Sequence, residues 1–233
     1  MLISYRNTFL CMLSAFLVAS PALAESLRVE GELQRGDDQL DGDGELYDTF
    51  EINLKAGQVL EVQMVSEDLD CYLVVLGPND EQIESDDAPD GVTDSSVVYV
   101  APVTGTYEII ATSAGIGEIG AYKLSATAFD SKPLKEQAGT LAEGDEISWK
   151  GGEYMDRIKV DLKKGEKQMI ELVSDDFDGF ISVHTPGHKV FQADDPAALI
   201  LEASEAGSYT VVVTSFGPGE IGDYVVKFRS IDE

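Results

Sequence analysis

Aspartates recur in two acidic segments of each half of the chain, and their carboxylates are the side chains best suited to chemistry. They are Asp68, Asp70, Asp86 and Asp87 in the first half and Asp176, Asp178, Asp194 and Asp195 in the second. Carboxylate oxygens are preferred calcium ligands, and clustered like charges otherwise repel. One hypothesis is therefore that these residues bind Ca²⁺. The alternative is that they cap turns and accept hydrogen bonds from nearby backbone amides.

Other chemical motifs in the sequence do not predict a catalytic site. His184 and His188 flank a Pro-Gly pair, which breaks the helix that a zinc pair at this spacing needs and favours a surface turn. Residues 115–120 and 217–222 fit G-x-G-x-x-G, but strand-like sequence follows them, so we expect hairpin loops rather than a dinucleotide site. Paired carboxylates are too numerous for any one pair to indicate glycosidase chemistry. We expect no catalytic residue and no organic cofactor.

The N-terminus has the pattern of a secretory signal peptide. Arg6 precedes an apolar run over residues 9–18, and Ala22 and Ala24 form an A-x-A cleavage site. We expect cleavage after Ala24 and a mature protein in the periplasm or outside the cell. No later run approaches the roughly 20 apolar residues of a spanning helix, so membrane insertion is not expected.

Charge and cysteine content narrow the range of partners. The formal net charge is −28, which disfavours nucleic acids and anionic lipids and favours basic partners or divalent cations. Cys71 is the one cysteine that remains after the signal peptide is removed, so an intramolecular disulfide is excluded. Because Cys71 begins the apolar run 71–76, we expect a buried thiol, with an intermolecular disulfide as the alternative.

The two halves of the chain are copies of one another. Corresponding segments are 31–37 and 139–145, 44–48 and 152–156, 65–70 and 173–178, 105–107 and 207–209, and 115–122 and 217–224. This similarity predicts a signal peptide at 1–24, a first repeat at 25–130, a second at 138–233, and a polar, proline-bearing linker at 131–137. At roughly 100 residues, each repeat is large enough for one β-sandwich.

Short strands dominate the predicted secondary structure. Residues 157–162 alternate between polar and apolar, and other short runs rich in β-branched and aromatic residues are separated by Gly, Pro, Asn and Asp. No long amphipathic helix is visible. The sequence therefore predicts an all-β protein with two tandem β-sandwich domains of jelly-roll type.

Several repeated motifs carry a family resemblance. They are the opening Gly-x-Leu-x-x-Gly-Asp at 31–37 and 139–145, the Ser-x-Asp-x-Asp at 66–70 and 174–178, and the closing Gly-x-Tyr at 120–122 and 222–224. With these motifs, each half resembles the bacterial pre-peptidase C-terminal domain, a β-sandwich module found beside secreted protease domains and in other exported proteins. The resemblance implies an accessory role in secretion, adhesion or substrate targeting, and some relatives bind calcium or matrix polymers. No peptidase domain accompanies the two copies here.

These features predict an exported, non-catalytic binding or accessory protein. Its partner would be a protein or polymer of the cell envelope or the extracellular space. The alternative is a partner, inhibitor or chaperone of a separately encoded secreted hydrolase, and a hydrolase that uses its own carboxylates is a third, less favoured hypothesis. Trp149 and the tyrosines could stack on sugars, although Tyr107, Tyr122, Tyr209 and Tyr224 lie in strand patterns that equally favour core packing.

Overall fold

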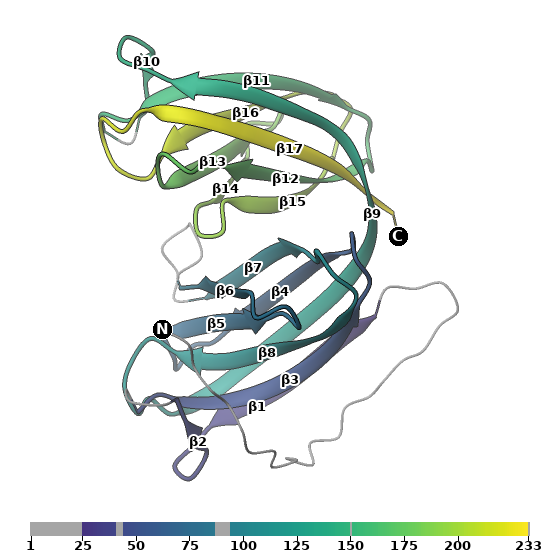
Figure 1. Cartoon of the computed structure of the whole chain (residues 1–233), viewed down its shortest axis with the longest axis vertical. Helices are drawn as coiled ribbons and strands as arrows, with labels where there is room; N and C mark the ends of the chain where they lie inside the picture. The colour runs from purple at the N-terminus through teal and green to yellow at the C-terminus, as the bar shows by residue number, and fades with distance from the viewer. Residues whose placement is uncertain (1–24, 41–43, 87–93, 150, 233) are drawn as a thin grey trace.

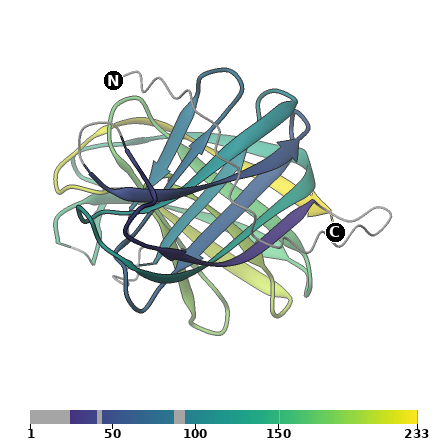
Figure 2. The same cartoon turned by 90° about the horizontal axis from the view of Figure 1, so that it is seen from below.

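The computed structural model describes residues 25–40, 44–86, 94–149 and 151–232, and these residues form strands β1 to β17 joined by turns (Figure 1). The predicted signal peptide and Asp87 lie outside the described residues. None of the described residues belongs to a helix capable of spanning a membrane. The chain forms two β-sandwiches, as predicted, and one is stacked on the other (Figures 1 and 2).

The first sandwich packs two antiparallel sheets around one core. One sheet contains β1 (Ser26–Leu33), the first part of β9 (Gly120–Leu141), β4 (Val59–Val65) and β7 (Ser95–Val100). The other has the order β2 (Asp38–Gln39), β3 (Leu46–Leu54), β8 (Gly105–Ser113), β5 (Cys71–Leu76) and β6 (Gln82–Ser85). Between them lies a cluster of buried side chains that includes Leu33, Ile52, Leu73 and Tyr107.

The second sandwich repeats this arrangement strand for strand. Its first sheet contains the second part of β9, then β17 (Gly222–Asp232), β12 (Lys167–Val173) and β15 (Ala198–Glu202). Its other sheet has the order β10 (Glu146–Ile147), β11 (Tyr154–Leu162), β16 (Gly207–Ser215), β13 (Gly179–His184) and β14 (Val190–Ala193). Along β11, Ile158, Val160 and Leu162 are buried and the residues between them are exposed, as their alternation predicts.

Strand β9 belongs to both sandwiches. Residues 120–129 pair with β1 on one side and β4 on the other, and residues 130–141 pair with β17. The predicted linker at 131–137 is therefore wrong, because this segment is the middle of a 22-residue strand. Pro133 is tolerated because it lies at a register shift opposite Arg229, on a stretch with only one neighbouring strand.

A third hydrophobic cluster joins the two sandwiches. It consists of Val59, Val98, Phe129, Met169, Ala198 and Ile231, which come from β4, β7, β9, β12, β15 and β17. The ammonium group of Lys167 lies 4.1 Å from the centre of the Phe129 ring, which adds a cation–π contact at the edge of this cluster. Because the cluster draws on both copies, the copies are packed together as well as connected by β9.

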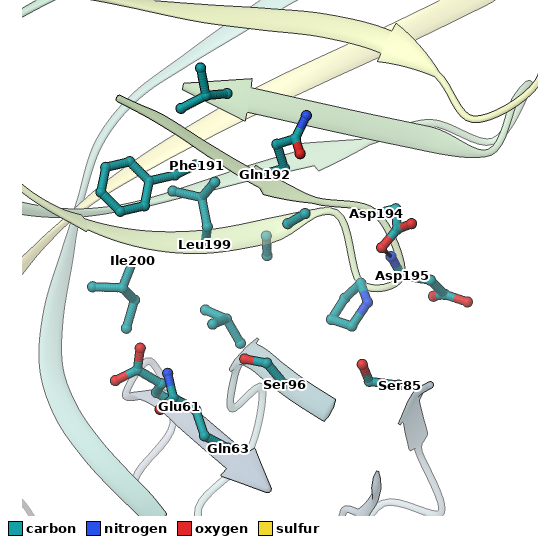
Figure 3. A pocket seen from close by; sticks show the side chains of 15 residues that line it. Glu61, Gln63, Ser85, Ser96, Phe191, Gln192, Asp194, Asp195, Leu199 and Ile200 are labelled. Atoms are coloured by element: carbon teal, nitrogen blue, oxygen red, sulfur yellow. Dashed lines mark hydrogen bonds between the residues drawn. The ribbon is translucent and has the colours of Figure 1, made fainter. Parts of the chain in front are cut away.

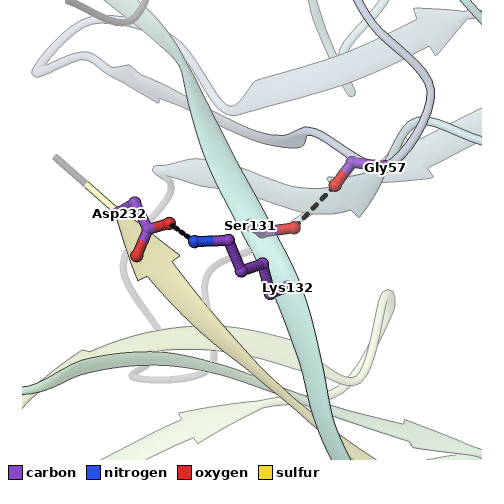
Figure 4. Close-up of polar contacts among 4 residues, drawn as sticks. All are labelled: Gly57, Ser131, Lys132 and Asp232. Atoms are coloured by element: carbon purple, nitrogen blue, oxygen red, sulfur yellow. Dashed lines mark hydrogen bonds and ion pairs between the residues drawn. The ribbon is translucent and has the colours of Figure 1, made fainter.

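Polar contacts reinforce this junction near the middle of β9. The Ser131 hydroxyl donates to the carbonyl of Gly57 at 2.6 Å (Figure 4). Arg229 donates from Nε to the Ser131 hydroxyl at 2.9 Å and from Nη2 to the Gly57 carbonyl at 3.1 Å. One arginine of the second sandwich thus holds a turn of the first. Lys132 and Asp232 form an ion pair of 2.6 Å nearby, but its side chains are 75% and 47% exposed.

Replacing Arg229 with alanine should therefore destabilise the protein more than replacing Lys132. We expect Arg229→Ala to lower the free energy of unfolding by about 2 kcal/mol, because it removes two charge-assisted hydrogen bonds in a partly buried site. Lys132→Ala should have little effect, since exposed ion pairs contribute little to stability. Urea denaturation of both variants measures the difference, and equal losses would contradict the role assigned to Arg229.

Candidate functional site

Two of the eight predicted calcium ligands are occupied in fixing a turn to the last strand of their sandwich. The Asp68 carboxylate accepts a hydrogen bond from the amide of Ala121 at 3.3 Å, and Asp176 accepts one from the amide of Asp223 at 2.8 Å. Ser66 and Ser174 donate to the carbonyls of those same two strand residues, both at 2.8 Å. Each serine and aspartate together hold one strand residue, and we call this pair a serine–aspartate bracket. For these two aspartates the geometry favours the turn role.

Asp70 and Asp178, the next aspartates of the repeat, form backbone hydrogen bonds beside the glycine-rich loops. The Asp70 amide donates to the Glu118 carboxylate at 3.2 Å and its carbonyl accepts from Ala114 at 2.9 Å. The Asp178 carbonyl accepts from Phe216 at 2.7 Å. The loops at 115–120 and 217–222 were predicted to be hairpins, which is wrong: each crosses between sheets, from β8 to β9 and from β16 to β17.

Asp195 lies near acidic residues of both copies. Partial burial and the charges of Asp178, Asp194 and Glu84 raise the pKa of Asp195. Glu84 belongs to β6 of the first sandwich, so acidic residues of both copies lie close together here. Asp194 accepts the backbone amide of Asp195 at 3.0 Å. Asp86 is exposed directly after β6, and Asp87 is outside the described residues.

The described aspartates differ in their surroundings. Within the described parts of the chain, no group of three or more His, Cys, Asp or Glu side chains is placed to hold a metal ion. Asp68 and Asp176 accept backbone amides, whereas Asp195 lies near other carboxylates. Calcium binding by the eight aspartates remains a prediction from the sequence.

The histidines lie in and beside a turn. His184 ends β13, and its ring packs edge-on against Trp149 with 5.3 Å between centroids. Burial and the charge of Arg157 lower the pKa of His184. His188 occupies the turn itself with φ 64°, and Asp80 has φ 62° at the matching place in the first copy. The two copies thus share the turn geometry, whereas the imidazoles are confined to the second.

The repeated tyrosines serve the core. Tyr107 and Tyr209 are buried and donate to the carbonyls of Val103 and Glu205, both at 2.9 Å. Tyr122 donates to Asp48 at 2.5 Å, and its copy in the second sandwich, Tyr224, donates to Asp156 at 2.7 Å. Burial raises the pKa of Asp48, although the hydrogen bond from Tyr122 opposes this shift. These four rings are therefore not a sugar-binding platform, and Trp149, 52% exposed, stands apart from them.

The sequence did not reveal a groove between the sandwiches. It has a volume of about 310 Å³, and its walls come from both copies (Figure 3). Residues of the first copy are Glu61, Gln63, Ser85, Ser96 and Val98; those of the second are Val190, Phe191, Gln192, Ala193, Asp194, Asp195, Pro196, Ala198, Leu199 and Ile200. In the sequence, the adjacent apolar residues Val190 and Phe191 are a signal for this groove. That signal could be interpreted only by knowing where the two copies meet, and in the structure both side chains are exposed.

Part of the first sandwich matches a known family. Residues 46–113 match the model of the bacterial pre-peptidase C-terminal domain. The matched stretch runs from the start of β3 to the end of β8. It therefore includes β5 and Cys71 as well as the Ser66–Asp68 bracket.

Comparisons with whole proteins give weaker likenesses. No curated protein sequence matches the chain. Tripeptidyl peptidase 2 is similar with 11% identity and a TM-score of 0.31 over 93% of this chain, which spans only 24% of that protein. The CUB1-EGF-CUB2 domain of human MASP-1/3 has 11% identity and a TM-score of 0.26, over 87% of this chain and 99% of that one. The M60 catalytic domain of Clostridium perfringens ZmpB with its CBM51 domains has 11% identity and a TM-score of 0.26, over 94% of this chain and 37% of that one.

If the serine–aspartate brackets are structural, they should stabilise the protein without calcium. In EDTA, we expect Asp176→Ala to lower the free energy of unfolding by about 1 kcal/mol, or roughly 2–4 °C in melting temperature, because one hydrogen bond to the Asp223 amide is lost. The neighbouring exposed Asp175→Ala should have little effect. A calcium-dependent rise in the wild-type melting temperature that is lost in Asp176→Ala would instead make the carboxylate a metal ligand.

Cys71 should be unreactive in the folded protein. Its side chain is fully buried, and burial, helped by the charges of Asp94, Asp70 and Glu118, raises the pKa of the thiol to about 12. The reactive thiolate is therefore disfavoured at neutral pH. We expect no reaction with a thiol reagent in buffer and complete reaction in denaturant, whereas Glu32→Cys, which adds an exposed thiol, should react in both. Disulfide-linked dimers of the native protein would contradict this assignment.

Proposed function

We propose that this chain is an exported, non-catalytic binding protein that engages a protein or polymer of the cell envelope or the extracellular space. The observation that carries the proposal is the groove between the sandwiches, which is formed by residues of both copies. The pre-peptidase C-terminal domain match supports an accessory role. The signal-like residues 1–24 support export, with a mature chain that begins at Glu25.

Both sandwiches are, in this proposal, copies of the same module. The matching strand order and the repeated serine–aspartate and tyrosine–aspartate contacts support membership of the second sandwich in the same family. The domain limits proposed from the sequence, 25–130 and 138–233, are then joined by the shared strand β9. Because β9 and the third hydrophobic cluster fix the copies together, a ligand would meet one preformed surface rather than two tethered binders.

A second candidate is a partner, inhibitor or chaperone of a separately encoded secreted hydrolase. The family name favours it, since the matched module is called a pre-peptidase domain. The two candidates differ in the ligand and in the effect of binding on that ligand. A hydrolase partner would show altered activity or folding yield, whereas an envelope or matrix ligand would only be held.

Binding of the mature chain to purified ligands tests the proposal. We expect saturable binding to one class among peptidoglycan, envelope polysaccharide, matrix protein and secreted hydrolases, with a dissociation constant on the order of micromolar. A heat-unfolded sample is the control for nonspecific attraction to the acidic chain. Absence of saturable binding to every class would contradict the proposal, and turnover of any ligand by the pure protein would contradict its non-catalytic character.

A further inference from the structure

Strands with unpaired edges line the groove. Among the described strands, β7, β14 and β15 each pair with one neighbour only: β4, β13 and β12 respectively. All three contribute lining residues, and Figure 3 shows the β14–β15 side facing Glu61, Gln63 and Ser96 of the first sandwich. An unpaired strand edge offers backbone donors and acceptors that an extended polypeptide can satisfy.

The groove is acidic. Three of its lining residues, Glu61, Asp194 and Asp195, carry carboxylates, and none of the described lining residues is basic. Glu84 and Asp178 lie near enough to add to the charge that raises the pKa of Asp195. Burial raises the pKa of Glu61, and only the nearby Lys167 opposes this. A ligand that brought positive charge would therefore relieve repulsion among carboxylates of both copies.

Apolar side chains lie between these charges. Val190 and Phe191 of β14 are 46% and 43% exposed, so their side chains offer an apolar surface that a ligand could cover. Val98, Leu199 and Ile200 continue the apolar surface toward the floor of the groove. The surface thus combines two kinds of side chain: carboxylates on β4 and directly after β14, and hydrocarbon on β7, β14 and β15.

We propose that the groove binds an extended segment of a partner polypeptide that carries both basic and apolar side chains. Backbone groups of the segment pair with a free strand edge, its basic side chains meet Glu61, Asp194 and Asp195, and its apolar side chains cover Phe191 and its neighbours. Because successive side chains of an extended chain point to opposite faces, such a segment can contact both walls of the groove at once. This inference rests on the proposed binding function and names the partner's chemistry.

Other occupants lack one of these features. A polyamine matches the charge but leaves the strand edges and Phe191 uncovered. An acidic or neutral polysaccharide gains nothing from the carboxylates, and Tyr107, Tyr209 and Tyr224, three of the rings considered for sugar stacking, are in the core. The strand edges together with the charge therefore favour a basic polypeptide.

Fluorescence anisotropy with labelled peptides tests the proposal on the mature chain. The probe is a Lys-Val repeat of six residues. A Glu-Val repeat controls for charge, and a Lys-Gly repeat keeps the charge but lacks apolar side chains and strand propensity. We expect the Lys-Val peptide to bind at least about tenfold more tightly than either control, which corresponds to about 1.4 kcal/mol. Equal binding of Lys-Gly would overturn the extended apolar segment and leave only charge attraction.

Variants on the two walls locate the binding site. We expect Asp195→Lys on the second copy and Gln63→Lys on the first each to weaken the Lys-Val peptide by about tenfold or more. Asp161→Lys and Gln34→Lys make the same charge changes at exposed positions outside the groove and should stay within about twofold at physiological salt, where distant charges are screened. Thermal unfolding checks that each variant is folded. Unchanged affinity in both groove variants, or equal loss in the controls, would overturn the proposal.

The outcomes separate this inference from the broader function. If the protein binds an envelope or matrix ligand but no Lys-Val peptide, the binding function stands and the basic segment is wrong. If the peptide binds in the groove while no envelope, matrix or hydrolase ligand binds, the groove assignment stands and the broader function is wrong.

Discussion

The pairing of β9 with strands of both sandwiches determines how the rest of the molecule is arranged. Its first part closes the first sandwich between β1 and β4, and its second part occupies in the second sandwich the place that β1 has in the first. The direction of one strand therefore sets the orientation of two cores. Val59 and Met169 can meet in a shared cluster because no flexible segment intervenes. The groove depends on the same constraint, since its walls belong to different copies.

Polar contacts and close packing explain several of the residues that the two copies share. The tyrosines of the closing Gly-x-Tyr motifs lie over Gly31 and Gly139, where an added Cβ would come within 2.3 Å of each ring. Their hydroxyl groups donate to Asp48 and Asp156, and the serine–aspartate brackets hold the residue just before each tyrosine. The tyrosine–aspartate contacts are partly buried, where a hydroxyl or carboxylate without a partner would be costly, so each tyrosine and its aspartate are needed together. Repetition in the sequence here reflects folding.

Sequence reasoning succeeded where local pattern decides the outcome. Alternation placed Ile158 and Val160 in a core, and the apolar run after Cys71 formed a buried strand. It failed where strand pairing decides the outcome: charges and Pro133 suggested a linker, yet that segment pairs with β17. The loop 115–120 was expected to join paired strands, but local sequence does not state which strands pair. The groove was missed for the same reason.

Duplication forms this groove between the two copies. Matching edge strands contribute to both walls, because β6 and β7 of the first copy correspond to β14 and β15 of the second. The walls differ in one respect: Glu61 and Gln63 of β4 line the first wall, whereas β12, the counterpart of β4, contributes no lining residue to the second. Phe191 and Asp195 contribute to the groove only because the first copy faces them, so neither sandwich contains the site alone. The aspartates of the repeat accordingly have different roles at different positions. Asp176 accepts a hydrogen bond that fixes a strand, whereas Asp195 adds negative charge where the copies meet.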